Sequence, residues 1–374
     1  MRVLSLNCGS SSLKHALFEV DETTEREVAR GSVERIGEAV PDHGAAVRLL
    51  LDDLERRDET RPDAVGHRIV HGGERFVRPT RVDPAVVASL RELVPLAPLH
   101  LPAEILAIEA VAARWPDRAQ VACFDTAFHH TLSEVARRYA LPEDADRQGL
   151  RRYGFHGLSY EYVVDAVGAQ TLGRAVLAHL GNGASMAAVR DGRSIDTTMG
   201  FSPAGGLVMG TRLGDVDPGL LVHWLAASPT RTAEALDDLV NHRSGLLGIS
   251  GTTADMRDLF ARRGKDPRAA LALDVFAWSA RKWVGAMAAT LGGIDTLVFT
   301  GGVGEHSSWM RAEIARGLEH LGVRLDDERN ERNERADPII SAPGAACTVR
   351  VIKTDEERMV ARHARREVVG PSPG

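Results

Sequence analysis

The chain of 374 residues has little cysteine, no cluster of basic residues and no long apolar run. Its cysteines, Cys8, Cys123 and Cys347, are odd in number and widely spaced, which argues against a disulfide framework or a zinc site and indicates a reducing compartment. No apolar run approaches the roughly 18 residues of a membrane span, and the N-terminus lacks the anatomy of a signal peptide. The net charge of -6 is dispersed, which argues against nucleic acid and anionic membranes as partners. We therefore expect a cytoplasmic protein that meets any anionic substrate through local cations.

The length favours two domains, and apolar strand patterns alternate with helical ones, which is typical of an α/β protein. Strands are predicted at 64–71, 118–125, 175–180, 295–300 and 348–353, and helices at 84–97, 102–115 and 267–291. The segment 4–20 resembles 175–192, since each has an apolar strand, a small polar turn and a return strand, as a duplicated domain would. A third strand ends in glycines at 301–302 and precedes a predicted helix at 310–322. Ligands gather at strand ends in α/β folds, so these three turns predict a nucleotide held between two domains.

The first strand runs into a polar turn with Asn7, Gly9 and the serines 10–12, and Lys14 follows on the return strand. Such a turn can direct backbone amides and hydroxyls at phosphate, and a lysine can meet phosphate charge. The turn is neither a Walker A sequence nor a dinucleotide fingerprint, so an ordinary hairpin remains the alternative.

Arg68 lies in an apolar strand context, where a cation needs an anionic partner. That partner is either a structural carboxylate, the commoner case for an isolated arginine, or an anionic substrate. His67 and His71 are spaced like helix-borne metal ligands, but the segment lacks the glutamate of a zincin and is predicted as strand, so we do not expect a metal there.

Other polar residues follow strands or lie in irregular segments. Asp125 lies at the end of a predicted strand and before a helical stretch, where it could simply cap the helix. His156 lies between glycines and could donate to an oxyanion, although a lone histidine is usually structural. Arg212 lies close to Asp215 and Asp217, so a local ion pair competes with a substrate role.

Glu356 and Glu357 precede or begin a predicted C-terminal helix, where acidic residues are favourable in the first turn without any ligand. They could also hold Mg²⁺, which prefers oxygen ligands and keeps most of its waters. One carboxylate and one amide such as Asn7 would then suffice beside phosphate oxygens.

Taken together, these segments resemble the acetate kinase family, which includes acetate and propionate kinases. The matching motifs run in family order from Val3 to about Ala361, and their number makes the resemblance specific. They are NCGSSSLK, GHRIVHGGERF, LAPLH, FDTAFH, RRYGFHG, HLGNGAS, DTTMGFSP, MGTRLGDVDPG, SGLLGISG, VFTGGVGEH and TDEE.

The resemblance implies two duplicated ribonuclease H-like domains of the actin, sugar kinase and Hsp70 type around a nucleotide cleft. The N-terminal domain would comprise 1–128 plus a returning helix at 358–374, and the C-terminal domain 129–357. The implied reaction is reversible, direct in-line phosphoryl transfer between ATP and acetate, giving acetyl phosphate and ADP, with Mg²⁺ or alternatively Mn²⁺. A homodimer is implied as well, and the apolar patterns on the second-half helices permit it.

The resemblance also assigns roles to residues. The catalytic residues would be Asp125, His156 and Arg212, and the carboxylate substrate would contact Arg68, Val70, Leu99, Phe155 and Pro203. ATP would contact Lys14, His179, Leu180, Gly181, Asn182, Gly183, Asp255, Met256, Arg257, Gly302, Val303, Gly304, Glu305 and His306. Asn7 and Glu356 would place Mg²⁺. A carboxylate substrate is already a competent nucleophile, so no base is needed, and we expect Asp125 to orient Arg68 or the metal.

The chain departs from the family pattern beside the implied acyl pocket and in one nucleotide segment. The departures are Leu101 and Glu104 for asparagines, Leu158 and Tyr160 for Thr and His, Ala204 and Gly205 for Leu-Glu, and His306 for asparagine. The first three pairs leave the length of the acyl chain open, because each extra buried methylene contributes about 0.8 kcal/mol. The last leaves the phosphoryl donor open.

Two alternatives to an acetate kinase follow. One is a kinase for propionate or another short-chain carboxylate, and the other is a non-catalytic, actin-like nucleotide-binding protein. The joint presence of Arg68, Asp125, His156 and Arg212 argues against the second, since binding alone would not require all four. The charged segment 326–337 and the tail 368–374 are expected to be solvated and without a chemical role.

Overall fold

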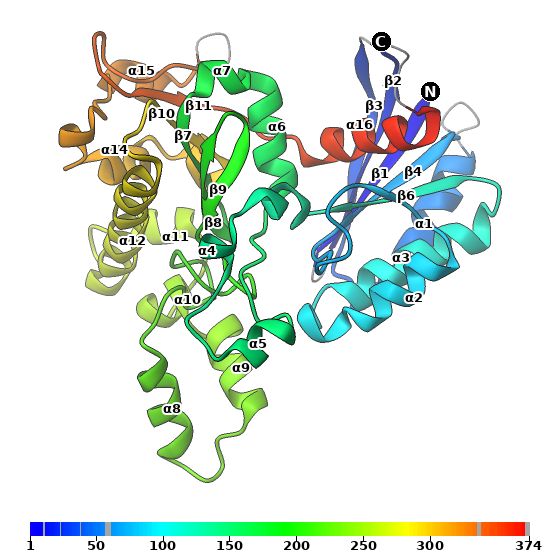
Figure 1. Cartoon of the computed structure of the whole chain (residues 1–374), viewed down its shortest axis with the longest axis horizontal. Coiled ribbons are helices and arrows are strands. Elements are labelled where there is room, and N and C mark those ends of the chain that lie inside the picture. Colours follow the sequence, from blue (N-terminus) through cyan, green and yellow to red (C-terminus); the bar gives the residue numbers. More distant parts are fainter. Residues whose placement is uncertain (10–11, 23, 38, 57–60, 335–337, 371–374) are drawn as a thin grey trace. The chain divides into compact units, whose positions relative to one another are not determined.

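The computed structural model describes residues 1–9, 12–22, 24–37, 39–56, 61–334 and 338–370. Ser10 and Ser11 of the predicted phosphate turn, the end of the charged segment at 335–337 and the tail at 371–374 therefore lie outside the described residues. The chain divides into two compact units, shown in Figure 1. Unit 1 comprises Met1–His130, Phe155–Tyr162 and Asp355–Gly374, and unit 2 comprises Thr131–Gly154 and Val163–Thr354.

These units differ from the sequence-based boundaries at three short segments. Residues 129–130, 155–162 and 355–357 belong to unit 1, whereas the sequence-based boundaries put them in the second domain. Hydrogen bonds explain the last two differences. Gly157 N–H donates to the carbonyl of Asp125 at 2.8 Å, and Arg30 binds Asp355 at 2.9 Å and Glu357 at 3.1 Å.

The described part of unit 1 forms one six-stranded sheet in the order β3-β2-β1-β4-β6-β5. Its strands are β1 (Arg2–Cys8), β2 (Ser12–Val20), β3 (Glu25–Glu34), β4 (Ala64–Ile69), β5 (Thr80–Arg81) and β6 (Ala119–Phe124). The first three strands form an antiparallel meander, while β4 and β6 run parallel to β1. Its helical elements are α1 (His43–Arg56), α2 (Pro84–Glu92), η2 (Val94–Leu96), α3 (Leu101–Arg114), η3 (Ala127–Thr131) and α16 (Glu356–Val369).

Alternating residues of the strands build a core on each face of this sheet, because successive strand side chains point to opposite faces. Leu4 and Leu6 pack with α1 and α3 in one apolar cluster, whereas Val3 packs with α16 in another. In Figure 1, α16 (red) lies along the unit 1 strands, and residues such as Val360 cover β4. Helices α1 and α3 on one face and α16 on the other thus hold the strands whose carboxyl ends form one edge of the sheet.

Unit 2 repeats this plan, and its described sheet has the order β11-β10-β7-β8-β9. Its strands are β7 (Arg174–Leu180), β8 (Ala184–Arg190), β9 (Arg193–Thr197), β10 (Thr296–Thr300) and β11 (Thr348–Val351). Again a meander of three antiparallel strands is followed by two parallel ones. The predicted α/β class and the predicted duplication are confirmed, and the two similar sequence segments are the β1–β2 and β7–β8 hairpins.

The helices of unit 2 are of mixed length, and the predicted helix at 267–291 is found with the same bounds. They are α4 (Glu134–Arg137), α5 (Glu143–Arg147), α7 (Ala169–Leu172), α8 (Pro218–Ala226), α9 (Ala233–His242), α10 (Gly245–Ser250), α11 (Met256–Arg262), α12 (Pro267–Leu291), α13 (Gly301–His306), α14 (Ser308–Ala315), η4 (Glu319–Leu321) and α15 (Asp327–Arg332). One further helix, α6 (Gly157–Val167), begins in unit 1. The predicted helix at 310–322 is broken after α14, where Gly317 takes a positive φ of 84°.

Candidate functional site

Unit 1 brings Asn7, Arg68 and Asp125 together at the edge where its parallel strands end. Asn7 lies near the end of β1, Arg68 near the end of β4 and Asp125 directly after β6. The strand register pairs Leu6 with His67, so the next residues, Asn7 and Arg68, are also neighbours. The carboxyl ends of adjacent parallel strands meet at one edge, which explains why residues far apart in the sequence converge.

The Arg68 guanidinium is held by two partners in this cluster. Nε lies 3.1 Å from both carboxylate oxygens of Asp125 and Nη2 lies 2.5 Å from Oδ2, while Nη1 donates to Oδ1 of Asn7 at 2.9 Å. Burial alone would lower the pKa of Arg68, but the charges of Asp125 and Glu356 raise it. Arg68 therefore keeps a full positive charge at the sheet edge. Its carboxylate partner, left open by the sequence, is Asp125, itself a predicted site residue.

Glu356 lies in the first turn of α16 and approaches the same cluster, 3.9 Å from Nε of Arg68. Burial raises the pKa of Glu356, against the opposing charges of Arg68 and Lys14. The adjacent Glu357 instead pairs with Arg30 at 3.1 Å, and the helix cap is supplied by Asp355. The paired glutamates thus have different surroundings, and only Glu356 shares the charge of Arg68.

His156 lies directly before α6 and has a φ of +59°, a left-handed conformation that is uncommon for a non-glycine residue. It is held there from both sides. Its carbonyl accepts from Tyr160 N–H at 3.1 Å, and the neighbouring Gly157 packs so closely on Asp125 that a Cβ would collide with the Asp125 carbonyl oxygen. Backbone strain of this kind is concentrated at functional sites. The close packing of Gly157 on Asp125 places His156 next to the Asp125 backbone.

The other predicted residues of unit 1 differ in exposure. Val70 and Phe155 are buried, whereas Leu99 is 46% exposed, so only the first two have the burial expected of an apolar pocket wall. Lys14 lies in β2 opposite Asn7 in the β1–β2 register and is exposed. His67 and His71 do not belong to a group of three or more His, Cys, Asp or Glu placed to hold a metal ion, and the described residues contain no such group. Burial lowers the pKa of each of these histidines to about 4.

Unit 2 brings together several of the predicted nucleotide-binding segments. β7 and β10 are parallel neighbours with His179 paired to Thr300, so the turn 181–183 and helix α13 share one edge. The carbonyl of Asn182 accepts from Gly210 N–H at 2.9 Å, and a Cβ on Gly210 would collide with Asn182. Gly210 begins the loop that carries Arg212, and Nη1 of Arg212 donates to the carbonyl of Pro203 at 3.4 Å.

The acidic neighbours of Arg212 have other hydrogen bonds. Asp215 accepts from Gly206 N–H at 2.8 Å, and Asp217 caps α8 through Gly219 N–H at 2.9 Å. The hydrogen bonds of these carboxylates thus stabilise the loop and the start of α8.

Two predicted nucleotide contacts have structural explanations of their own. The Asp255 carboxylate caps α11 and pairs with Arg257 at 2.6 Å, and these hydrogen bonds lower the pKa of Asp255 to about 2. The Glu305 carboxylate is buried and accepts from Gly301 N–H at 3.1 Å and Thr354 N–H at 3.2 Å, so it holds the glycine turn. His306, at the end of α13, is exposed.

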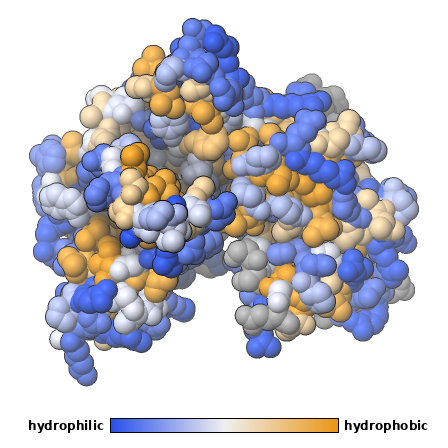
Figure 2. All heavy atoms as spheres, turned by 90° about the horizontal axis from the view of Figure 1, so that it is seen from below, coloured by the Kyte–Doolittle hydropathy of each residue, from blue (hydrophilic) through white to orange (hydrophobic). Residues whose placement is uncertain are grey.

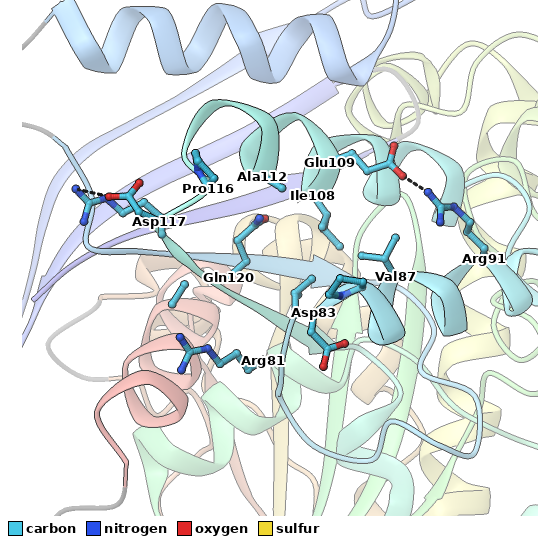
Figure 3. A pocket seen from close by; sticks show the side chains of 14 residues that line it. Arg81, Asp83, Val87, Arg91, Ile108, Glu109, Ala112, Pro116, Asp117 and Gln120 are labelled. Atoms are coloured by element: carbon cyan, nitrogen blue, oxygen red, sulfur yellow. Dashed lines mark hydrogen bonds and ion pairs between the residues drawn. The ribbon is translucent and has the colours of Figure 1, made fainter.

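A cavity of about 510 Å³ in unit 1 lies away from all these residues, among α2, α3 and the start of β6 (Figure 3). Arg91 and Glu109 on its rim form an ion pair, and Gln120 contributes a hydrogen bond of 2.7 Å to the buried His67. None of the predicted site residues lines it. Of its charged side chains, Arg91 pairs with Glu109, Arg118 pairs with Asp117 and Asp83 caps α2. We therefore do not take this cavity as the candidate site.

One buried carboxyl was not predicted as a site residue. Glu104, noted from the sequence only as a departure from the family pattern, is 2% exposed and accepts a hydrogen bond from the backbone of Val70. The available signal was its place within the apolar pattern of the predicted helix at 102–115, where a glutamate must find a buried partner.

Comparison with known proteins agrees over nearly the whole chain. The family model of the acetokinase family matches residues 2–362. An acetate kinase of Rhodopseudomonas palustris is 44% identical over 392 residues, covering 97% of this chain and 98% of that protein. One of Micrococcus luteus is 46% identical over 383 residues, with the same coverage.

Solved structures give the same result. The crystal structure of an acetate kinase of Porphyromonas gingivalis matches with a TM-score of 0.89 and 39% identity, covering 98% of this chain and 99% of that one. A propionate kinase of Francisella tularensis matches with a TM-score of 0.91 and 33% identity, covering 98% and 100%. Family model, relatives and fold are thus consistent, and the chain belongs to the acetokinase family.

Proposed function

We propose that this protein is an acetate kinase, a phosphotransferase with a carboxyl group as acceptor. It catalyses the reversible transfer of the γ-phosphoryl group of ATP to acetate, with Mg²⁺, giving acetyl phosphate and ADP. The observation that carries the proposal is the partly buried Arg68 guanidinium at the strand-end edge of unit 1, held by Asp125 and Asn7 in a chain of this family.

Arg68 is suited to binding a carboxylate. Its contacts with Asp125 and Asn7 use one N–H of each terminal nitrogen, and a guanidinium carries a second N–H on each. With 18% of its side chain exposed, those donors can meet the planar oxygens of a carboxylate or of an acyl phosphate. Buried Val70 and Phe155 would contact the methyl end of the substrate.

The reaction needs positioning and charge neutralisation more than covalent chemistry by the protein. In the forward direction a carboxylate oxygen attacks the γ-phosphorus in line, and the bond from phosphorus to the β,γ-bridging oxygen breaks to release ADP. The acceptor is already ionised at neutral pH, so we assign Asp125 to orienting Arg68. His156 and Arg212 would stabilise the charge on the transferring group.

The residues at the unit 1 edge fit Mg²⁺. The amide oxygen of Asn7 and the carboxylate of Glu356 are oxygen donors of the kind it prefers, and Mg²⁺ usually needs few protein ligands beside phosphate oxygens and waters. Bound there, the metal would neutralise phosphate charge. For the nucleotide we propose Lys14, the turn 179–183, the start of α11 at 255–257 and the segment 302–306.

The direct test is trapping of the acyl phosphate as hydroxamate, with purified protein, Mg·ATP and hydroxylamine, run in parallel with acetate, propionate and butyrate. We expect turnover with acetate to exceed the others. A preference for propionate or butyrate would assign Leu101, Ala204 and Gly205 to a longer acyl chain. ATP binding without carboxylate-dependent turnover would instead indicate a nucleotide-binding protein.

We also propose a cytoplasmic homodimer. No helix in the described part of the chain is long and apolar enough to cross a membrane. Figure 2 shows apolar side chains among a mostly hydrophilic surface, and the exposed large apolar residues of unit 2 include Leu220, Val222 and Trp278. Exposed side chains of this kind are typical of interfaces when they form a patch.

We expect light scattering coupled to size-exclusion chromatography to give about twice the chain mass of 40.4 kDa. Val222→Asp, on α8, and Trp278→Ala, on α12, are expected to shift the mass towards the monomer if these surfaces carry the interface. Leu49→Asp, on the exposed side of α1 in unit 1, is the matched control. A monomeric wild-type protein at micromolar concentration would contradict the proposal.

A further inference from the structure

Glu104 is a buried carboxyl group that the proposed chemistry does not use. It lies in the first turn of α3 and is 2% exposed. The other glutamate of this helix, Glu109, is 41% exposed at its side chain and pairs with Arg91. Burying a carboxyl group costs free energy unless hydrogen bonds or nearby charges compensate it. The partners of Glu104 are therefore informative.

Three hydrogen-bonding contacts hold the chain segment at the end of β4 and directly after it, and the carboxyl group of Glu104 makes one of them. Both of its oxygens lie 3.2 Å from Val70 N, whose N–H they accept. On either side, the carbonyl of Ile69 accepts from Asp125 N–H at 2.9 Å, and Gly72 N–H donates to Oγ1 of Thr126 at 3.0 Å. Glu104 therefore fixes the segment that carries Arg68 and Val70, the two central contacts of the proposed carboxylate site.

The same carboxyl group belongs to the electrostatic surroundings of Arg68. The charges of Arg68 of β4 and Asp125 after β6 act on it, and the charge of Glu104 acts in turn on the thiol of Cys8 in β1. Burial raises the pKa of that thiol to about 12, so it stays neutral. Arg68 already compensates Asp125 and Glu356, so an ionised Glu104 adds a third negative charge around one cation.

We propose that Glu104 is a positioning residue for the acyl substrate: it fixes the backbone at Val70, and its protonation state sets how strongly Arg68 attracts the substrate carboxylate. This inference rests on the proposed function. In the neutral form, the carboxyl group still accepts the hydrogen bond from Val70 N–H. It does not offset the positive charge of Arg68, which can then attract the substrate carboxylate. In the ionised form, the added charge opposes binding of an anion.

Glu104 is expected to change its protonation state within a pH range in which the KM can be measured. Burial raises the pKa of Glu104 to about 8, although the charge of Arg68 and the Val70 N–H act in the opposite direction. The neutral form therefore predominates at pH 7 and the charged form above the raised pKa. The KM for the carboxylate should rise with pH across this range, while the KM for ATP should not follow it.

The test compares wild type, Glu104→Gln and Glu104→Ala by ADP release with saturating Mg·ATP, from pH 6.5 to 9.5. For wild type we expect the acetate KM to rise about fivefold or more, the size of an ordinary coupling between two sites. E104Q keeps an oxygen acceptor for Val70 N–H but cannot ionise, so its KM should match wild type at pH 7 and stay level. E104A loses the acceptor for Val70 N–H and should show a raised KM for acetate at every pH. Glu109→Gln, on the same helix, is the control and should follow wild type.

Thermal unfolding supplies a readout independent of turnover. A carboxyl group whose pKa is raised by folding stabilises the native state fully below its unfolded pKa, and this contribution is lost as pH rises through the folded pKa. The melting temperature of wild type should therefore fall relative to that of E104Q between about pH 5 and pH 8. Parallel melting curves would overturn the inference.

Failure of this inference is distinguishable from failure of the proposed function. Parallel pH profiles for wild type and E104Q, or equal changes in the KM for ATP and for acetate, would overturn the role of Glu104 while leaving an active kinase. Absence of carboxylate-dependent turnover in wild type at every pH would remove the proposed function and this inference with it.

Discussion

Replacing Asp125 by Asn is expected to lower turnover by about 10³-fold while leaving ATP binding near normal, because a well-placed arginine contributes about that much to phosphoryl transfer. Asp125 orients Arg68 through both Nε and Nη2. Asparagine offers one oxygen in place of two and directs an amide N–H₂ at the guanidinium. The measurement is kcat and the KM values by ADP release, together with ATP affinity by calorimetry.

The control for this prediction is a second arginine–aspartate pair with similar geometry. Arg174 donates through Nε at 3.0 Å and Nη2 at 2.6 Å to Asp295 in unit 2, where neither residue is a predicted site residue. Asp295→Asn should keep turnover within about twofold. Loss of one partner of a buried ion pair costs about 3–5 kcal/mol of stability, so melting curves must show that D125N is folded at the assay temperature. Unchanged turnover in folded D125N would refute the role of Asp125.

Glu356→Gln is expected to lower kcat by about 10²-fold and to raise the Mg²⁺ concentration needed for half-maximal rate, because a neutral amide is a weaker ligand than a carboxylate. The carboxylate lies 3.9 Å from Nε of Arg68, and the charge of Lys14 also acts on it. It is therefore placed to act together with both cations. The measurement is a Mg²⁺ titration of the initial rate at fixed ATP.

Glu357→Gln provides the matched control. Both glutamates lie in the first turn of α16, but Glu357 pairs with Arg30 at 3.1 Å, whereas Glu356 approaches Arg68. We expect E357Q to keep the wild-type Mg²⁺ dependence. Equal effects of the two substitutions would mean that the first turn contributes only general negative charge, and Glu356 would lose its assignment as a metal ligand.

Sequence patterns predicted the secondary structure well where the pattern was long or repeated. The helix at 267–291 was found with the predicted bounds because it is a long apolar repeat with Asp266 as its cap and Gly292 at its end. The duplication could be predicted because both hairpins place small polar residues between two apolar strands. The segments 155–162 and 355–357 were harder to assign, since hydrogen bonds to distant residues decide which unit they join.

Local sequence therefore determined the α/β class, the repeated hairpins and the motifs that identify the family. Only the tertiary structure decided how the polar residues are used, because each partner comes from another strand or helix. Asp125 could have been a helix cap, but the parallel register of β4 and β6 places it against Arg68. Glu104 is one of several acids on predicted helices until folding buries it against Val70 N–H. Burial and charge depend on neighbours distant in the sequence, and a pattern of adjacent residues does not contain them.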